Sequence, residues 1–188
     1  MIWFTSDTHF NHGNIVQFCN RPYEDLAEMT AALIENWNSC VKPGDVIYHL
    51  GDFALTWGKQ HDELIDSLLT QLNGNKFLIT GNHDREPVTR NPRWTKVAPY
   101  HELTVDIGGV KQPIVLCHYA MRVWNRSHYG AWMLHGHSHG TLRDLGGKIL
   151  DVGVDCSGYR PVDIDTVAFI MQSRKISCDD SYSKENQT

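Results

Sequence analysis

Five polar clusters recur along the chain, and each follows a short apolar run with the composition of a buried strand. In chain order they are Asp7-Thr8-His9, Gly51-Asp52, Gly81-Asn82-His83-Asp84, His118 and Gly136-His137-Ser138-His139. They supply carboxylates, imidazoles and one amide, which are oxygen and nitrogen ligands for divalent metals. Because open α/β sheets bind ligands beyond the carboxyl ends of their strands, this placement predicts that the clusters meet at one sheet edge.

The first half of the chain alternates strand-like and helix-like segments. Apolar runs predict strands over Ile2–Thr5, Val46–Tyr48 and Lys76–Thr80. Apolar residues at helical spacing predict helices over Tyr23–Ser39 and Lys59–Leu72. This order of strand, helix, strand, helix and strand is typical of a parallel sheet.

The second half has the pattern of short strands joined by glycine turns. We expect two hairpins, a short strand between them and a last strand, over Leu103–Ile107 with Val110–Cys117, Ala131–Leu134, Thr141–Leu145 with Lys148–Val154, and Val167–Met171. The pattern favours an α/β sandwich of two mixed sheets flanked by helices. We expect a single domain over residues 1–176, followed by a polar, frayed tail over residues 177–188.

Composition limits the classes of function. The 188 residues are 41% hydrophobic and 21% charged, as expected of one ordered globular domain. A net charge of −5 argues against a broad surface for long nucleic acids. The five cysteines form no CxxC pair, which favours reduced thiols in a cytoplasmic protein over a disulfide framework. We find neither a signal-peptide pattern nor an apolar run of membrane-spanning length, so we expect no membrane association.

The five clusters together resemble the pattern D-x-H, G-D, G-N-H-D/E, H and G-H-x-H of the calcineurin-like metallophosphoesterase superfamily. The opening Ser6–Ile15, and the closing segment Val152–Asp155 through Tyr159-Arg160-Pro161, are similar to small single-domain bacterial and phage phosphoesterases. The likeness covers about residues 1 to 171. A single D-x-H or G-D is weak evidence, whereas the ordered set is highly specific.

The resemblance implies a role for each residue of the clusters. A first metal would take Asp7, His9, Asp52 and His139, and a second would take Asp52, Asn82, His118 and His137. Asp52 would therefore bridge the two ions. His83 would act at the scissile phosphate as a catalytic residue, and Asp84 would orient His83. Cys117, beside His118, is expected to be a core residue.

This assignment is consistent with hydrolysis by a metal-bound hydroxide. Two divalent ions outweigh the negative charge of Asp7, Asp52 and one hydroxide, so net positive charge remains to attract a phosphate. Metal binding lowers the pKa of water toward neutrality, so no protein base is required. Hard and borderline ligands suit Mn, which we expect, as well as Fe, Zn, Ni or Co.

We therefore expect a phosphodiesterase that acts on small, nucleotide-like phosphate esters. A phosphomonoesterase or protein phosphatase is the alternative within the same class. A non-catalytic scaffold of the same fold is a further alternative, disfavoured because no ligand and no catalytic histidine has been lost. The oligomeric state stays open.

Several residues near the clusters keep two interpretations. His12 and Asn14 are either substrate contacts or ordinary loop residues, and Arg122 and Arg126 are either a phosphate clamp or exposed arginines. His49 and His135 lie in predicted strands and could support the ligands. Close relatives often have proline where this chain has Ala120, which concerns the shape of the substrate loop and not a ligand.

Overall fold

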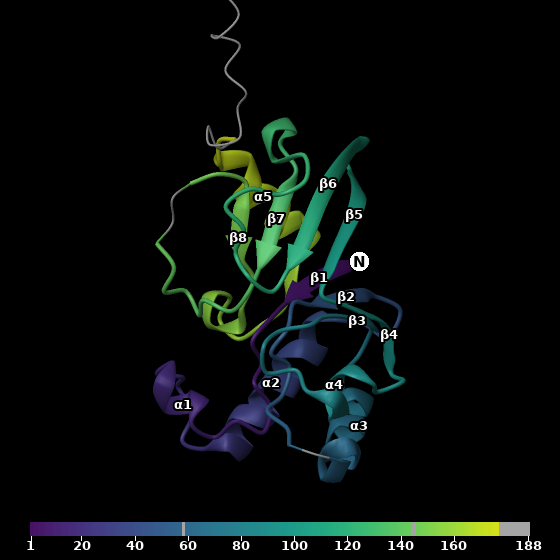
Figure 1. Cartoon of the computed structure of the whole chain (residues 1–188), viewed down its shortest axis with the longest axis vertical. Coiled ribbons are helices and arrows are strands. Elements are labelled where there is room, and N and C mark those ends of the chain that lie inside the picture. The colour runs from purple at the N-terminus through teal and green to yellow at the C-terminus, as the bar shows by residue number, and fades with distance from the viewer. Residues whose placement is uncertain (58, 144–145, 177–188) are drawn as a thin grey trace, which may run out of the picture.

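The computed structural model describes residues 1–57, 59–143 and 146–176, so the predicted tail over residues 177–188 lies outside the described residues. Within these ranges the chain forms two mixed β-sheets with flanking helices, which confirms the predicted α/β sandwich (Figure 1). None of the helices in the described ranges combines the length and apolar character needed to cross a membrane.

The first sheet is mainly parallel and has the strand order β4-β3-β2-β1-β9. Its strands are β1 (Ile2–Thr5), β2 (Val46–His49), β3 (Asn75–Ile79), β4 (Trp94–Ala98) and β9 (Val162–Asp163). Strands β1 to β4 run parallel and β9 is antiparallel to β1. The three strands predicted in the first half are therefore confirmed, and their carboxyl ends lie at the same edge.

The second sheet has the order β5-β6-β7-β8. Its strands are β5 (Tyr100–Ile107), β6 (Val110–Cys117), β7 (Trp132–His135) and β8 (Ile149–Asp151). The predicted first hairpin is confirmed, because β5 and β6 pair antiparallel across Gly108 and Gly109, which both have positive φ. Strands β6, β7 and β8 are parallel, so β6 and β7 also end on one side (Figure 1).

Alternation along the strands divides the apolar residues between cores. Ile47 of β2 packs with the helices on the outer face of the first sheet, whereas Phe4 and Tyr48 face the second sheet. Ile114 and Leu116 of β6 meet them between the sheets, together with the apolar face of α5 (Ile164–Ser173). Successive side chains of a strand point to opposite faces, so the strands of the first sheet contribute to the core beneath the helices and to the core between the sheets.

Two longer helices cover the first sheet. The predicted first helix is confirmed but begins later, as α2 (Leu26–Cys40), because the Asp25 side chain accepts a hydrogen bond from the Glu28 N–H and caps it. Its face of Met29, Leu33 and Trp37 is buried, which contributes roughly 1.5–3 kcal/mol per side chain. The predicted second helix is present as a 3₁₀ turn (Lys59–His61) followed by α3 (Asp62–Gln71).

The predicted last strand over Val167–Met171 is wrong, because this segment is part of helix α5. The Asp163 side chain caps the helix by accepting hydrogen bonds from the N–H groups of Asp165 and Thr166. Ile164, Val167, Ala168 and Met171 are buried on one face, at helical spacing. Without the capping residue, the short apolar run is compatible with the period of a strand and with that of a helix.

The predicted second hairpin is also wrong. Ile149–Asp151 form β8, which pairs in parallel with β7, and residues 141–143 have no strand structure. Residues 144–145 of the expected first arm lie outside the described residues. β6 lies between β5 and β7, so the other edge of β7 is open and β8 pairs there.

Several short elements escaped prediction. These are β4, β9, α1 (Ile15–Phe18), α4 (Glu86–Thr89) and the 3₁₀ turns Ser127–Tyr129 and Val154–Cys156. β4 contains Thr95 and Lys96 and so has no continuous apolar run, and the other elements have too few residues to show a period. Contacts with the rest of the fold define all of them.

Candidate metal centre

Backbone hydrogen bonds bring together the loops that follow the parallel strands. The Asp7 N–H donates to the Gly51 carbonyl and the His9 N–H to the Asp52 carbonyl, both at 3.0 Å. From the second sheet, the His137 N–H donates to the Asp7 carboxylate at 2.9 Å. The predicted clusters therefore meet at one place, although they are far apart in the chain.

Left-handed backbone conformations mark this place. Five of the seven predicted ligands have positive φ without being glycine, namely Asp7, His9, Asp52, His137 and His139, with φ between 48° and 70°. Such positions cost about 1–3 kcal/mol each and gather at functional sites. Here they turn successive side chains of one loop toward a common point.

Two glycines of the clusters are needed for close approach. A Cβ on Gly136 would overlap Ser6 Oγ and an oxygen of the Asp7 carboxylate. A Cβ on Gly81 would overlap an oxygen of the Asp52 carboxylate. Any larger residue at either position would displace a carboxylate of the centre.

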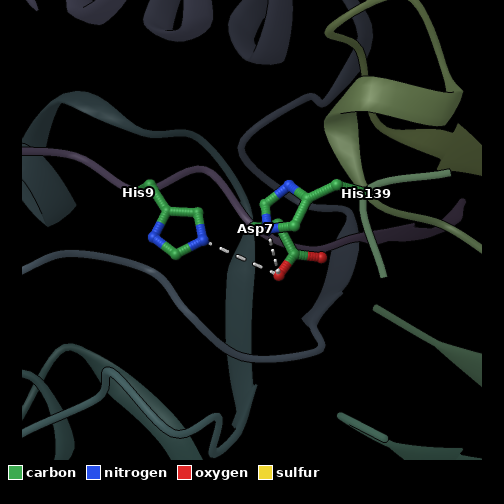
Figure 2. Close-up of side chains that lie close together, drawn as sticks. All are labelled: Asp7, His9 and His139. Carbon is green, nitrogen blue, oxygen red and sulfur yellow. Dashed lines mark ion pairs between the residues drawn. The ribbon is translucent and has the colours of Figure 1, made fainter. Parts of the chain in front are cut away.

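We call Asp7, His9 and His139 the inner group. Their ligand atoms all lie within 4.8 Å of one another. His9 Nε2 and His139 Nε2 face the same Asp7 oxygen, Oδ1, at 3.9 Å and 4.0 Å, as Figure 2 shows. Asp7 and His9 are almost wholly buried and His139 is partly buried.

We call Asp52, Asn82, His118 and His137 the outer group. Asp52, His118 and His137 also have ligand atoms within 4.8 Å of one another. His118 Nε2 lies 3.4 Å from Asp52 Oδ2 and 3.1 Å from Asn82 Oδ1. His118 Nδ1 donates to the Leu50 carbonyl at 2.8 Å, which directs Nε2 to these oxygens.

Asp52 lies between the two groups. Its Oδ2 is 3.7 Å from His9 Nε2 and 3.4 Å from His118 Nε2, and its Oδ1 accepts a hydrogen bond from the His83 N–H at 2.8 Å. Burial raises the pKa of Asp52, but the hydrogen bond and charge of His118 outweigh it and hold the pKa at about 2. Asp52 is therefore an ionised carboxylate that both groups share.

The unsatisfied groups of the centre fit a bound cation. Both ring nitrogens of His9 are buried without a hydrogen-bond partner among the described residues. Burial lowers the pKa of His9 to about 2 and raises that of Asp7 to about 7. Burial thus disfavours the charged form of both side chains, and a divalent ion would satisfy the neutral imidazole and stabilise the ionised form of the Asp7 carboxylate.

His83 belongs to neither ligand group, but its ring contacts the inner group. Its ring centre lies 5.3 Å from that of His9 and 6.0 Å from that of His12. The expected contact from Asp84 differs: its carboxylate accepts hydrogen bonds from the N–H groups of Gly81, Asp52 and Phe53. In the described ranges no hydrogen bond joins Asp84 to the His83 ring, so Asp84 holds the backbone of both loops instead.

The supporting residues include two that sequence reasoning left open. His49 is buried, and its Nε2 lies 3.0 Å from Thr8 Oγ1, which donates to the Phe53 carbonyl at 2.8 Å. His135 lies behind the last cluster, with Nδ1 2.8 Å from the Gly136 carbonyl. Both histidines therefore contact the ligand loops from behind.

Two further residues at the centre were assigned no role from the sequence. Asp155 Oδ2 lies 2.7 Å from His139 Nδ1, and Arg21 is bound to both oxygens of Asp155. Asp155 lies in the closing segment that resembles phage and bacterial phosphoesterases, whereas no motif marks Arg21. Cys19, His139 and Asp155 form a third group with ligand atoms within 4.8 Å.

The fold and these groups define a protein class: an α/β sandwich that carries a candidate centre for more than one divalent ion on loops at its strand ends. The chain belongs to the calcineurin-like phosphoesterase family, whose sequence model matches residues 1–151. Family and ligand groups together support metal-dependent hydrolysis of phosphate esters as the class of activity.

Relatives span most of the chain. An uncharacterised protein of Methanocaldococcus jannaschii is 32% identical over 181 residues, covering 93% of each chain. The gene 66 protein of Mycobacterium phage L5 is 26% identical, covering 83% of this chain and 87% of its own. A protein of unknown function from Aquifex aeolicus has a similar fold, with a TM-score of 0.68 at 22% identity, over 90% of this chain and 98% of its own.

Proposed function

We propose that this chain is a dinuclear metal-dependent phosphoesterase that prefers compact, nucleotide-like phosphodiesters. The observation that carries the proposal is the position of Asp52. Its carboxylate lies between two ligand groups, within 3.7 Å of a ring nitrogen of one and 3.4 Å of a ring nitrogen of the other. A carboxylate in that position suits a bridge between two ions.

The residues of the two groups divide the work of holding metal. The inner group would hold one ion and the outer group the other, with Asp52 contributing to both. Divalent ions in such a pair supply Lewis-acid charge and a hydrolytic nucleophile at neutral pH. Carboxylate, imidazole and amide ligands without thiolate suit manganese, with iron, zinc, nickel and cobalt as alternatives.

His83 is the residue we assign to the substrate. It is half-buried beside the inner group, and its own N–H is fixed by Asp52 Oδ1. Its imidazole can donate to a phosphoryl oxygen or give a proton to the departing alkoxide. Asp84 supports this step indirectly, because its carboxylate fixes the backbone on both sides of the centre.

Neutral side chains beside the outer group and beside His83 support a diester. The Tyr119 hydroxyl donates to Asn82 Oδ1 at 3.4 Å, and its ring packs on His137 with centres 4.7 Å apart. His12 lies beside His83, and burial lowers its pKa. Neutral neighbours suit a diester, which carries one negative charge where a monoester carries up to two.

Paired assays test the proposal. With added Mn²⁺ we expect a higher kcat/KM for bis-p-nitrophenyl phosphate than for p-nitrophenyl phosphate, and loss of turnover in His83→Gln. A strong preference for the monoester would overturn the diester assignment and favour a phosphomonoesterase. Absence of hydrolysis of both esters, and of cyclic and linear nucleotides, with each candidate metal would overturn the phosphoesterase itself and favour a scaffold.

A further inference from the structure

A buried arginine lies directly behind the inner group. The Arg21 side chain is 0% exposed and follows helix α1 in a loop. Burying a guanidinium beside a centre that attracts cations is costly, unless its charge and its donors are fully matched. The burial of Arg21 at this position therefore needs a structural explanation.

Every donor direction of Arg21 is used. Its Nε and one terminal nitrogen donate to the two oxygens of Asp155, at 2.9 Å and 2.8 Å. The terminal nitrogens also donate to the carbonyls of Asp7 and Thr8, at 2.7 Å and 3.0 Å, and one contacts Met29 Sδ at 3.4 Å. This bidentate pair gives a fixed geometry as well as charge balance.

Asp155, held by Arg21, in turn orients the His139 ring. The Asp155 carboxylate can only accept from His139 Nδ1, at 2.7 Å, so Nδ1 carries the proton. Nε2 is then directed to Asp7 Oδ1, 4.0 Å away. A carboxylate behind an imidazole ligand fixes the tautomer, the ring orientation and the basicity of the ligand.

The same guanidinium fixes the other side of the inner group. By holding the carbonyls of Asp7 and Thr8, it supports a loop in which Asp7 and His9 have φ of 58° and 50°. Through Asp155, this one side chain therefore connects the Asp7 loop to His139. It acts in addition to the bonds from the His137 N–H to the Asp7 carboxylate and to the isolated bridge between Ser6 and Gly153. In the third group of Cys19, His139 and Asp155, the Asp155 carboxylate already accepts two bonds from Arg21 and one from His139 Nδ1.

We infer that Arg21 is a positioning residue that, through Asp155 and the Asp7–Thr8 backbone, prepares the inner group to bind its ion. This inference rests on the two-metal centre of the proposed function. It assigns Arg21 no contact with substrate, and it predicts that its loss weakens one of the two metal sites and spares the other.

The test measures Mn²⁺ binding to the full-length protein, by calorimetry and by metal analysis. We expect two ions in the wild type. We expect Arg21→Met to weaken one of them by about 10–100-fold, as is typical for outer partners of metal ligands, with the second ion nearly unchanged. Arg21→Lys keeps the charge but not the bidentate fork, so it should rescue the site only in part.

Two further variants separate positioning from folding. Arg21→Met leaves the Asp155 charge buried alone, so Arg21→Met/Asp155→Asn removes both charges and should fold more readily while still binding the inner ion weakly. The matched control is Arg93→Met/Asp66→Asn, which removes an exposed bidentate pair with Nε–Oδ1 at 2.7 Å. Among the described residues this pair makes no hydrogen bond or ion pair with the predicted ligands. This control should bind both ions as the wild type does.

The outcomes are distinguishable. If the wild type binds two ions and the folded Arg21 variants also bind both with unchanged affinity, the inference is overturned and the proposed function stands. If both ions weaken equally in the Arg21 variants, Arg21 is merely structural and the inference is again overturned. If the wild type binds no divalent ion, the proposed function and the inference fail together.

Discussion

The inner and outer groups of the candidate centre have similar side chains in different surroundings. Asp7 and His9 of the inner group are 0% and 2% exposed, and Asp155 with Arg21 lies behind His139. In the outer group Asp52 and His118 are buried, but Asn82 and His137 are exposed. One group is therefore enclosed by the protein, and the other opens to solvent.

This difference in exposure suggests that the inner group holds its ion and that the outer group is the one that contacts the substrate. Buried ligands in fixed rotamers lose little entropy on binding and are slow to open. Exposed ligands leave room for an incoming ester and let an ion exchange. We therefore expect the inner ion to be the permanent one, and the outer ion to bind in contact with the substrate.

Replacing the shared carboxylate of Asp52 should impair both groups at once. We expect Asp52→Asn to lose both ions and at least about 10⁴-fold in kcat, more than the loss of a single acid or base residue costs. Metal analysis after gel filtration and the diester assay measure the two losses. Retention of two ions with normal affinity would show that Asp52 does not bridge the groups.

His83 belongs to neither group, so its loss should leave both groups intact. We expect His83→Gln to lower kcat by about 10²–10⁴-fold, the usual contribution of a positioned proton donor. Metal content should stay at two ions per chain. Loss of metal in this variant would make His83 a ligand and contradict its assignment to the substrate.

Gly136→Ala should damage the inner group selectively. The added Cβ would meet Ser6 Oγ and the Asp7 carboxylate, so we expect a loss of about 1–3 kcal/mol in the free energy of unfolding and a weaker inner ion. Urea denaturation and metal titration measure these effects. Gly44→Ala is the control, because nothing lies within 4 Å of its Cβ, and equal effects in both variants would count against a specific clash.

Chelation should remove the two ions at different rates. We expect the outer ion to leave at least about tenfold faster, because exposed side chains detach by local motion and buried ones need a larger opening. Stopped-flow mixing of the Mn²⁺-loaded protein with a chelator measures both phases. Asn82→Ala should accelerate the fast phase and leave the slow one, and a single phase in the wild type would contradict the distinction.

The pH dependence of the free energy of unfolding tests the role of His49, which contacts Thr8 in the loop of the inner group. Burial lowers its pKa from 6.5 to about 3, so below pH 6.5 the unfolded chain takes up a proton that the folded chain does not. This contribution to the free energy of unfolding is complete above pH 6.5 and falls toward pH 3, with a limiting slope of about 1.4 kcal/mol per pH unit.

Urea titrations of metal-free protein across this range measure the slope. His49→Leu should show a smaller slope than the wild type, although it also loses the contact with Thr8. Equal slopes in the two proteins would mean that His49 is protonated in the folded state and does not have the depressed pKa.

Sequence patterns anticipated the strands that carry the clusters. Ile2–Thr5 is observed with the predicted bounds, and the hairpin around Gly108-Gly109 also agrees. The same glycine pattern at Gly146-Gly147 did not give a hairpin, because Ile149–Asp151 pairs with β7 instead. The run Val167–Met171 failed as a strand because its decisive residue, the cap Asp163, lies outside the run. The type of an element can be predicted when the residues that decide it lie within the element itself.

By itself the sequence determined which candidate ligands the chain carries and in which order it presents them, because side-chain chemistry and strand ends are local properties. Only the tertiary structure decided how they are held. Arg21 meets Asp155 across 134 positions of sequence, and Thr8 meets His49 across 41. The first contact depends on how the two sheets pack and the second on how β1 pairs with β2, and no local pattern of charge or hydrophobicity specifies either arrangement.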